Sequence, residues 1–294
     1  MDHLTSLPAR TTYDTIVIGG GPAGLQAALT LGRMHRDVLL LDSGRYRNGT
    51  VEHAHNYATH DGIAPAELRR LARADLAAYD TVEVREVAAD RVEPDGDGFV
   101  VTIGDSTERA ATVVLATGVR DALPDVPGLA EAWGKEVAHC PFCHGHELAR
   151  GRVALDVEGP HLDRLTAMLT RIGAELVPVG GRVQRVERIG GGLDLTLDDS
   201  TIHVDGMFVA PSFSQSAPFA EQLGLDLNDS GCVRVDAFQS TSVAGVFAAG
   251  DAAHHRDLPM PMSSILTSQA AGLVAGGACV QHLLTREASA VAQR

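Results

Sequence analysis

The chain has 294 residues, enough for one large domain or two medium ones, each with its own core. A hydrophobic content of 45% and a charged content of 21% are those of a globular protein and exclude an intrinsically disordered chain. The net charge of −14 argues against a nucleic acid or an anionic membrane as partner, because both require a basic face.

Targeting and cysteine content indicate the compartment. No apolar signal segment occurs between Met1 and Asp14, and no apolar stretch reaches the ~20 residues of a membrane span. Only four cysteines are present, which excludes a disulfide scaffold. We therefore expect a cytoplasmic protein, where a closely spaced cysteine pair is redox-active or metal-binding.

The first expected elements form a strand–helix–strand unit. Residues 15–18 are an apolar run, residues 22–33 follow a helical pattern, and residues 37–41 are a second apolar run. The unit spans about 30 residues, the length of a parallel βαβ crossover.

The turn after the first strand has the Gly-x-Gly-x-x-Gly spacing of a dinucleotide fingerprint. Gly19 allows a tight turn, Gly21 lets the backbone approach a pyrophosphate, and Gly24 lets the helix pack closely on the strand. The helix N-terminus offers unpaired N–H groups to the phosphates. Asp42, at the end of the second strand, is placed to accept hydrogen bonds from ribose hydroxyls. An ordinary glycine-rich turn is the alternative.

The middle of the chain alternates between short elements. An amphipathic helix is expected over 65–79, and a small antiparallel meander from 82 to 117 ends in a strand at 112–116. The proline-rich segment 123–128 indicates a rigid linker, where we place a domain crossing.

A similar architecture follows the linker. A strand is expected at 152–157, a helix at 161–172 and a strand at 175–179. Near the C-terminus a strand at 246–249 precedes a long helix of small residues over 263–284. The sequence therefore predicts an α/β fold of two doubly wound, Rossmann-like domains, one inserted into the other. The predicted boundaries are 1–121 and 235–294 for the outer domain and 122–234 for the inserted domain.

Three segments together resemble the FAD signatures of the thioredoxin reductase-like flavoproteins. They are Gly19–Gly24, Ala116–Gly118 and Gly245–Asp251, in the family's order and over almost the whole chain. The resemblance implies FAD as cofactor, a homodimer, Asp251 on the ribityl chain, and the helix after Ser263 aimed at the flavin ring. The residues that it assigns to FAD are Gly19, Gly21, Pro22, Ala23, Gly24, Asp42, Asn56, Ala116, Thr117, Gly118, Gly250, Asp251, Gln269 and Ala270.

The segment from Cys140 to His146 carries the redox chemistry. Two thiols three residues apart can close a disulfide, and such a thiol often has a lowered pKa. The thiolate is the nucleophile, and His144 or His146 can serve as the base that forms it. There are three alternatives. Haem attachment would require export, and a zinc site would require a second pair of ligands. The third alternative is that both cysteines are inert thiols of the core. Cys232 and Cys279 are expected to be buried.

The resemblance also implies roles within the pair. Cys143 would lie against the flavin, and Cys140 would form the bond to substrate. Thioredoxin reductases carry an acid after the second cysteine, whereas this chain has His144 there. That version looks like the dithiol oxidases of disulfide natural products, of the gliotoxin, holomycin and romidepsin type.

The inserted domain lacks a second dinucleotide fingerprint. Residues 158–164 keep one glycine and begin with Glu158, and residues 179–182 lack paired basic residues for a 2′-phosphate. NADPH is therefore an improbable donor. We predict that a small-molecule dithiol delivers electrons through the cysteine pair to FAD, and that molecular oxygen removes them as H2O2.

Two other functions remain open from the sequence. The first is a thioredoxin reductase variant that uses ferredoxin or NADPH, and the second is a redox-sensing flavoprotein without turnover. A further group of histidines is expected in two loops that face the flavin; they are His53, His55, His60, His254 and His255. It is an equally good interpretation that they are solvated loop side chains without a role in the reaction.

Overall fold

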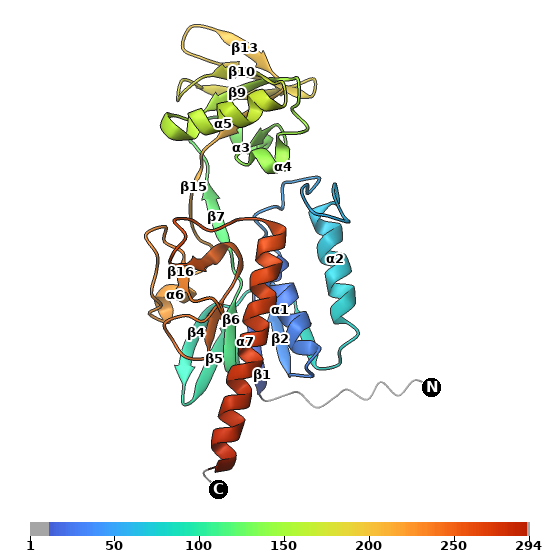
Figure 1. Ribbon diagram of the computed structural model, residues 1–294, viewed down its shortest axis with the longest axis vertical. Helices are drawn as coiled ribbons and strands as arrows, with labels where there is room; N and C mark the ends of the chain where they lie inside the picture. Colours follow the sequence, from blue (N-terminus) through green and yellow to red (C-terminus); the bar gives the residue numbers. More distant parts are fainter. Residues whose placement is uncertain (1–11, 293–294) are drawn as a thin grey trace, which may run out of the picture. The chain divides into compact units, whose positions relative to one another are not determined.

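A computed structural model describes residues 12–292, which form two compact units (Figure 1). The first unit contains the described chain up to Tyr46, Arg69–Val119 and the chain from Gln215 onward. The second contains Arg47–Leu68 and Arg120–Ser214. Both include a parallel sheet with a crossover helix, so the predicted Rossmann-like α/β fold is confirmed. Residues 1–11, on which the absence of a signal peptide was predicted, lie outside the described residues.

The first unit is built on a seven-stranded sheet of order β3-β2-β1-β6-β5-β4, with β17 paired to β6. Pairing is parallel from β3 to β6 and for β17, and antiparallel among β4, β5 and β6. The strands are β1 (Tyr13–Ile18), β2 (Val38–Leu41), β3 (Val82–Arg85), β4 (Arg91–Asp95), β5 (Gly98–Ile103), β6 (Ser106–Leu115) and β17 (Val246–Ala248). The meander is thus correct for β4–β6, but β3 extends the parallel part, because its backbone pairs with β2 at the sheet edge.

Two long helices pack against each other in this unit. They are α1 (Pro22–Gly32) and α7 (Ile265–Ala292), and small residues let their backbones approach closely. A methyl group added to Gly272 would lie 2.1 Å from the carbonyl oxygen of Ala23, and one added to Gly276 would lie 3.0 Å from that of Ala27. The small-residue composition of α7 therefore follows from its contact with α1.

Residues 215–234 belong to the first unit, so the second crossing lies at Ser214–Gln215 and not at the predicted 234. Phe219 and Val233 from this stretch are buried in the same core as the β1–β6 sheet. The remaining elements of the unit are α6 (Phe219–Gln222), β16 (Val233–Val235), η1 (Gly250–Ala252) and β18 (Ala253–His255). Strands β7 (Val119–Ala122) and β15 (Ser212–Gln215) pair where the chain crosses between units, and α2 (Pro65–Leu76) spans the crossing at Leu68–Arg69.

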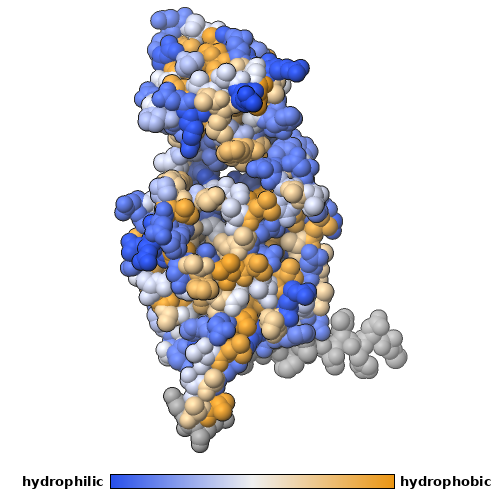
Figure 2. Space-filling model, in the orientation of Figure 1, coloured by the Kyte–Doolittle hydropathy of each residue, from blue (hydrophilic) through white to orange (hydrophobic). Residues whose placement is uncertain are grey.

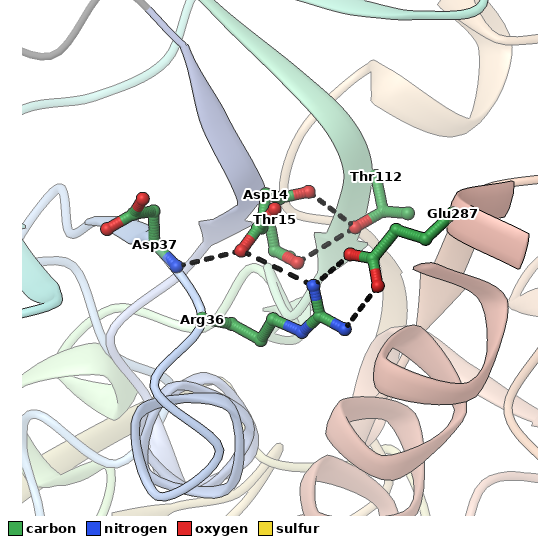
Figure 3. Close-up of polar contacts among 6 residues, drawn as sticks. All are labelled: Asp14, Thr15, Arg36, Asp37, Thr112 and Glu287. Carbon is green, nitrogen blue, oxygen red and sulfur yellow. Dashed lines mark hydrogen bonds and ion pairs between the residues drawn. The ribbon is translucent and has the colours of Figure 1, made fainter. Parts of the chain in front are cut away.

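A polar network anchors the amino-terminal end of β1 (Figure 3). The hydroxyls of Thr15 and Thr112 lie 2.8 Å apart in the buried core, and Thr112 also donates to the Asp14 carbonyl. Arg36 connects the carboxylates of Asp14 and Glu287, the latter on α7. This end of the sheet is fixed by structural contacts, and the opposite, carboxyl end is left for the site.

The second unit combines a four-stranded parallel sheet of order β10-β9-β14-β8 with an antiparallel sheet of order β11-β12-β13. Its strands are β8 (Val137–Ala138), β9 (Arg152–Asp156), β10 (Glu175–Pro178), β11 (Arg185–Ile189), β12 (Gly192–Thr196), β13 (Thr201–Val204) and β14 (Gly206–Val209). Its helices are α3 (Leu129–Ala132), α4 (Pro141–His144) and α5 (Gly159–Arg171). Leu165 and Leu169 of α5 pack on β9, as the predicted strand–helix–strand pattern requires.

The surface of the first unit is mixed, with one apolar line. Figure 2 shows apolar side chains along the exposed side of α7, where Leu266, Leu273, Leu284 and Val291 are exposed. No helix within residues 12–292 has the length and hydropathy needed to cross a bilayer.

Candidate active site and cofactor cradle

The glycine turn after β1 forms a cradle at the carboxyl end of the sheet. Gly19 has a φ of 115°, which favours glycine, and a methyl group on Gly24 would lie 1.8 Å from the Gly19 carbonyl oxygen. Gly21 faces open space within 4 Å of its absent Cβ. Gly21 is also the N-cap of α1, and no side chain caps the helix. The open backbone N–H groups and the open space fit the pyrophosphate of a dinucleotide such as FAD.

The other two predicted signatures meet this turn. A methyl group on Gly19 would lie 2.3 Å from the Ala116 carbonyl oxygen, because β1 and β6 are parallel neighbours. Gly250 follows β17 on the far side of β6, and a methyl group there would lie 3.0 Å from the Cβ of Ala23. The structure therefore brings Gly19–Gly24, Ala116–Gly118 and Gly250–Asp251 together at one edge of the sheet, and their contacts with FAD stay predictions.

Asp251 and α7 complete this edge. The Ser268 hydroxyl lies 3.4 Å from Asp251 Oδ1, which links η1 to the first turns of α7. Of the two residues that follow Ser268 in α7, Gln269 is half-buried and Ala270 is exposed. Their predicted places beside the flavin ring, and that of Thr117 in the second signature, stay predictions.

The Asp42 carboxylate is enclosed by other groups of the protein. Its side chain is 2% exposed and accepts hydrogen bonds from the Gly44 N–H (3.0 Å), the Tyr46 hydroxyl (2.6 Å) and Arg73. Burial opposes ionisation, yet these hydrogen bonds outweigh it and hold the pKa of Asp42 below its usual value. One lone pair on Oδ1 remains for a ribose hydroxyl. The sequence did not reveal Tyr46 or Arg73 as partners.

Basic and aromatic side chains surround Asp42. The Arg69 guanidinium lies 3.8 Å from the centroid of the Tyr46 ring, and Arg73 also contacts Glu86. Burial lowers the pKa of Arg69, whose side chain is stacked rather than solvated. These residues come from the loop after β2 and from α2, so no local sequence signal linked them to Asp42.

Asn56 lies in the segment 47–68, which packs with the second unit. It is exposed, its φ is 59°, and its backbone N–H donates to Asp61 Oδ1 at 2.7 Å. Its predicted contact with FAD stays a prediction. The structure gives it a turn-forming role, because asparagine tolerates left-handed backbone better than most residues.

The cysteine pair sits at the start of a single helical turn. Cys140 is the N-cap of α4, with Pro141 in the first position, so the backbone N–H groups of Phe142 and Cys143 point back towards its sulfur. Both cysteines are half-buried free thiols in this structure, and the Phe142 side chain between them is 69% exposed. The other two cysteines, Cys232 and Cys279, are fully buried, as expected.

The two thiols share one proton unequally. A hydrogen bond from the Cys143 thiol, the backbone N–H groups and the charge of Arg47 lower the pKa of Cys140 to about 7, although burial opposes this. The hydrogen bond to Cys140 and burial raise the pKa of Cys143. Of the reduced pair, Cys140 is therefore the thiol that ionises first, and Cys143 is the one that keeps its proton.

His144 and His146 have different environments. His144 is half-buried, and its Nδ1 is buried without a hydrogen-bond partner among the described residues. Burial lowers the pKa of His144, while the negative charge of Glu147 and the backbone of Gly134 act in the opposite direction. His146 is exposed. The neutral imidazole of His144, next to Cys143, is therefore the candidate proton acceptor.

The remaining histidines separate into two groups. His254 is a buried residue of β18, where its Nε2 lies 2.7 Å from the Ser230 hydroxyl, so the predicted loop position was wrong and its role is structural. His55 lies in the second unit, with Nε2 3.5 Å from Glu147 and Nδ1 3.5 Å from Asp61. His53 is exposed beside it and bonds the Gly62 carbonyl.

The edge of the inserted sheet differs from a nucleotide site. Glu158 is the N-cap of α5, and its carboxylate would lie 3.7 Å from a methyl group on Gly180. Arg182, after β10, donates to the carbonyls of Val179 and Pro178 through its Nε and one Nη. Asp156 accepts the Gly181 N–H. A phosphate at this helix end would meet acidic side chains instead of a basic clamp. Within residues 12–292 no three His, Cys, Asp or Glu side chains are arranged to hold a metal ion.

Known proteins match this chain over most of its length. The family model for pyridine nucleotide-disulphide oxidoreductases matches residues 13–193 and 177–272. Thioredoxin reductase sirT of Leptosphaeria maculans is 34% identical over 90% of this chain and 92% of its own length. Thioredoxin reductase tcpT of Claviceps purpurea (strain 20.1) is 33% identical over 81% of this chain and 86% of its own.

Solved structures match the fold as well. The crystal structure of HlmI has a TM-score of 0.81 and 28% identity, and covers 98% of both chains. An oxidoreductase from Agrobacterium tumefaciens has a TM-score of 0.80 and 29% identity over 93% of this chain and 99% of its own.

Proposed function

Because this chain belongs to the pyridine nucleotide-disulphide oxidoreductase family and is thioredoxin reductase-like, we propose that it is an FAD-dependent dithiol oxidase. The proposed reaction converts a small-molecule dithiol into its disulfide and passes two electrons to molecular oxygen, giving H2O2. The observation that carries the proposal is the acidic N-terminus of α5, where Glu158 is the N-cap and two donors of Arg182 bond backbone carbonyls, which disfavours NADPH as the electron donor.

The cradle residues fit FAD in this role. Gly19, Gly21 and Gly24 open the N-terminus of α1 to a pyrophosphate, and Asp42 and Asp251 supply carboxylate oxygens at either side. When bound, FAD would accept the electron pair of the reduced cysteines and pass it to oxygen. Everything else in the cycle is thiol chemistry of the chain's own residues.

The first exchange step opens the Cys140–Cys143 disulfide. A substrate thiolate attacks the sulfur of Cys140, the S–S bond to Cys143 breaks, and Cys143 leaves with the electron pair and takes a proton. Burial raises the pKa of Cys143 and so favours its protonated form after this step. His144, whose imidazole is kept neutral by burial, accepts the proton of the substrate thiol.

The second exchange step releases the product. The second substrate thiolate attacks the substrate sulfur of the mixed disulfide, and Cys140 leaves as a thiolate. A thiol with a pKa of about 7 leaves faster than an ordinary thiol, so the lowered pKa of Cys140 assists this step. The exposed Phe142 ring next to Cys140 offers an apolar contact for a small substrate.

A thioredoxin reductase that uses ferredoxin or NADPH is the second candidate. The names of the relatives favour it, since sirT and tcpT are both called thioredoxin reductases. It shares the cysteine pair and FAD but passes electrons from the cofactor to a protein disulfide. A homodimer and a cytoplasmic location stay predictions for either function.

Oxygen uptake tests the oxidase proposal. With 1,4-dithiothreitol as a surrogate dithiol, we expect sustained oxygen consumption with one H2O2 formed per disulfide, and none in Cys140→Ser or Cys143→Ser. Uptake that persists in both variants, or no uptake at all with several dithiols, would contradict the proposal.

A further inference from the structure

Asp42 is a buried carboxylate that packs directly on the glycine turn. Its side chain is 2% exposed, and a methyl group added to Gly20 would lie 2.0 Å from Asp42 Oδ2. Gly20 stands between Gly19 and Gly21, whose backbone fits a pyrophosphate. The carboxylate is therefore next to the place where the adenosine ribose of FAD would follow the pyrophosphate.

Tyr46 and Arg73 hold this carboxylate from two separate elements of the first unit. The Tyr46 hydroxyl donates to Asp42 Oδ2 at 2.6 Å, and Arg73 Nη2 donates to the same oxygen. Arg73 Nη2 also lies 3.4 Å from the Tyr46 hydroxyl oxygen, so the three groups contact one another in pairs. Tyr46 comes from the loop after β2 and Arg73 from α2. Such mutual contacts fix the orientation of a carboxylate, which a single contact does not.

The two donors are themselves held at a second point. The Arg69 guanidinium lies 3.8 Å from the centroid of the Tyr46 ring, and Arg73 Nη1 contacts the carboxylate of Glu86. Contacts within the protein therefore fix the Asp42 carboxylate, and a ligand that binds it does not have to immobilise it.

The hydrogen bonds leave one acceptor position on Asp42. A carboxylate offers about four lone-pair positions. Tyr46 and Arg73 use both positions on Oδ2, and the Gly44 N–H uses one on Oδ1 at 3.0 Å. The remaining position on Oδ1 can accept one hydrogen bond, and the hydroxyl of a ribose is a donor of the required kind.

We propose that Tyr46 and Arg73 are positioning residues for the cofactor: they orient the Asp42 carboxylate so that its free Oδ1 position accepts one hydroxyl of the adenosine ribose of FAD. The inference rests on FAD as the cofactor of the proposed function, but on neither the dithiol nor the electron acceptor. The alternative is a purely structural cluster that ties α2 and the loop after β2 to the sheet.

Titration of the apoprotein with FAD, followed by flavin fluorescence, tests the role of Tyr46. Tyr46→Phe keeps the ring over which Arg69 stacks and removes the hydroxyl. We expect its Kd for FAD to rise about tenfold, because a loosely held carboxylate binds the ribose hydroxyl less well. The matched control is Tyr79→Phe, which removes a hydroxyl that Arg33 contacts at 3.1 Å in the same unit. Its Kd is expected to equal that of wild type.

The same titration separates a positioning role of Arg73 from a structural one. Arg73→Met is expected to raise the Kd for FAD by about tenfold or more. Its control is Arg36→Met, because Arg36 likewise connects two carboxylates, those of Asp14 and Glu287, at the opposite end of the sheet. Arg36→Met is expected to lower the unfolding midpoint of the apoprotein and to keep the wild-type Kd. A purely structural cluster would give this result for Arg73→Met as well.

A double-mutant cycle shows whether Tyr46 acts through Asp42. In an Asp42→Ala background there is no carboxylate to orient, so adding Tyr46→Phe is expected to change the Kd by less than about twofold. A tenfold loss that persisted there would overturn the inference, since Tyr46 would then contact FAD directly. If Asp42→Ala does not melt cooperatively, Asp42→Asn replaces it. The effect of Tyr46→Phe is then expected to shrink to about threefold or less, because a neutral amide accepts a weaker hydrogen bond, and an undiminished effect would overturn the inference equally.

Wild-type or tighter FAD binding by a cooperatively melting Tyr46→Phe or Arg73→Met would also overturn the inference. The titrations use neither a dithiol nor oxygen, so that outcome would leave the oxygen-uptake test of the proposed function unaffected. Conversely, the expected affinities in a protein that never consumes oxygen with a dithiol would contradict the proposed function and leave this inference standing.

Discussion

The contact between α7 and α1 gives a prediction from two glycines on one helix. Gly272 faces Ala23, and a methyl group there would lie 2.1 Å from the Ala23 carbonyl oxygen, whereas Gly277 has nothing within 4 Å of its absent Cβ. Both positions are helical, so replacement by alanine gains the same helix propensity, ~1 kcal/mol. For Gly277→Ala that gain is the whole effect, and we expect a free energy of unfolding up to about 1 kcal/mol higher.

Gly272→Ala adds a clash with backbone. Ordinary contact would require α7 and α1 to separate by more than about 1 Å, and overpacking of this kind costs ~3 kcal/mol at its upper end. The net loss is about 2 kcal/mol, so the two variants are expected to differ by about 3 kcal/mol. Because Ala23 lies in the glycine turn, FAD affinity is also expected to fall in Gly272→Ala and to stay at the wild-type value in Gly277→Ala.

Urea unfolding followed by far-ultraviolet circular dichroism, with and without added FAD, measures both effects. If Gly272→Ala is as stable as Gly277→Ala, the close approach of the two helices described above is incorrect, and with it the reason for the small residues of α7.

Two further predictions concern the site. His144→Ala is expected to slow dithiol oxidation at neutral pH by about 10²-fold, because burial keeps the wild-type imidazole neutral and able to accept a proton. The loss is expected to shrink as pH rises towards the substrate thiol's pKa of ~8.5, where the thiol ionises without a base. His146 is exposed, and His146→Ala is expected to lose less activity. A loss for His146→Ala alone would reassign the base. The methyl group added in Gly21→Ala meets no protein atom, so this variant is expected to keep the wild-type unfolding midpoint in the absence of FAD. The same methyl group would fill the space for the pyrophosphate, so FAD affinity measured by titration is expected to fall at least tenfold. Unchanged FAD affinity would place the pyrophosphate elsewhere.

The parts of the fold that the sequence predicted are those with local signals. The β1–α1–β2 unit follows from two apolar runs around a glycine spacing, and α5 with its flanking strands follows from periodicity within about 30 residues. The three signature segments converge because parallel neighbouring strands end at one edge of the sheet.

Tertiary packing decides the parts that were missed. β3 has the period of a surface strand, yet its backbone pairs with β2 in parallel. Residues 215–234 carry no boundary signal, and their assignment follows from Phe219 and Val233 entering the core of the first unit. His254 was placed in a loop, because a single histidine gives no hint that Ser230 will bond it in a buried strand.

The candidate site shows the same division. The cysteine spacing and His144 are visible in sequence, since their chemistry lies within five residues. Arg47 and Asp121 are about 75 residues apart, and neither carries a motif, so only the fold brings them to each other. Tyr46 and Arg73 likewise reach Asp42 from separate elements.

The electron donor is the central claim, and air-free reduction of the flavin measures it. The purified protein is mixed in a stopped-flow instrument, under argon, with either an excess of dithiothreitol or an excess of NADPH, and flavin absorbance near 450 nm is followed. We expect the dithiol to bleach the flavin fully in the wild-type protein and not in Cys140→Ser. We expect NADPH to bleach it slowly or not at all, because the N-terminus of α5 begins with Glu158 and two donors of Arg182 bond backbone carbonyls. Rapid, stoichiometric bleaching by NADPH would contradict the oxidase account and identify a reductase.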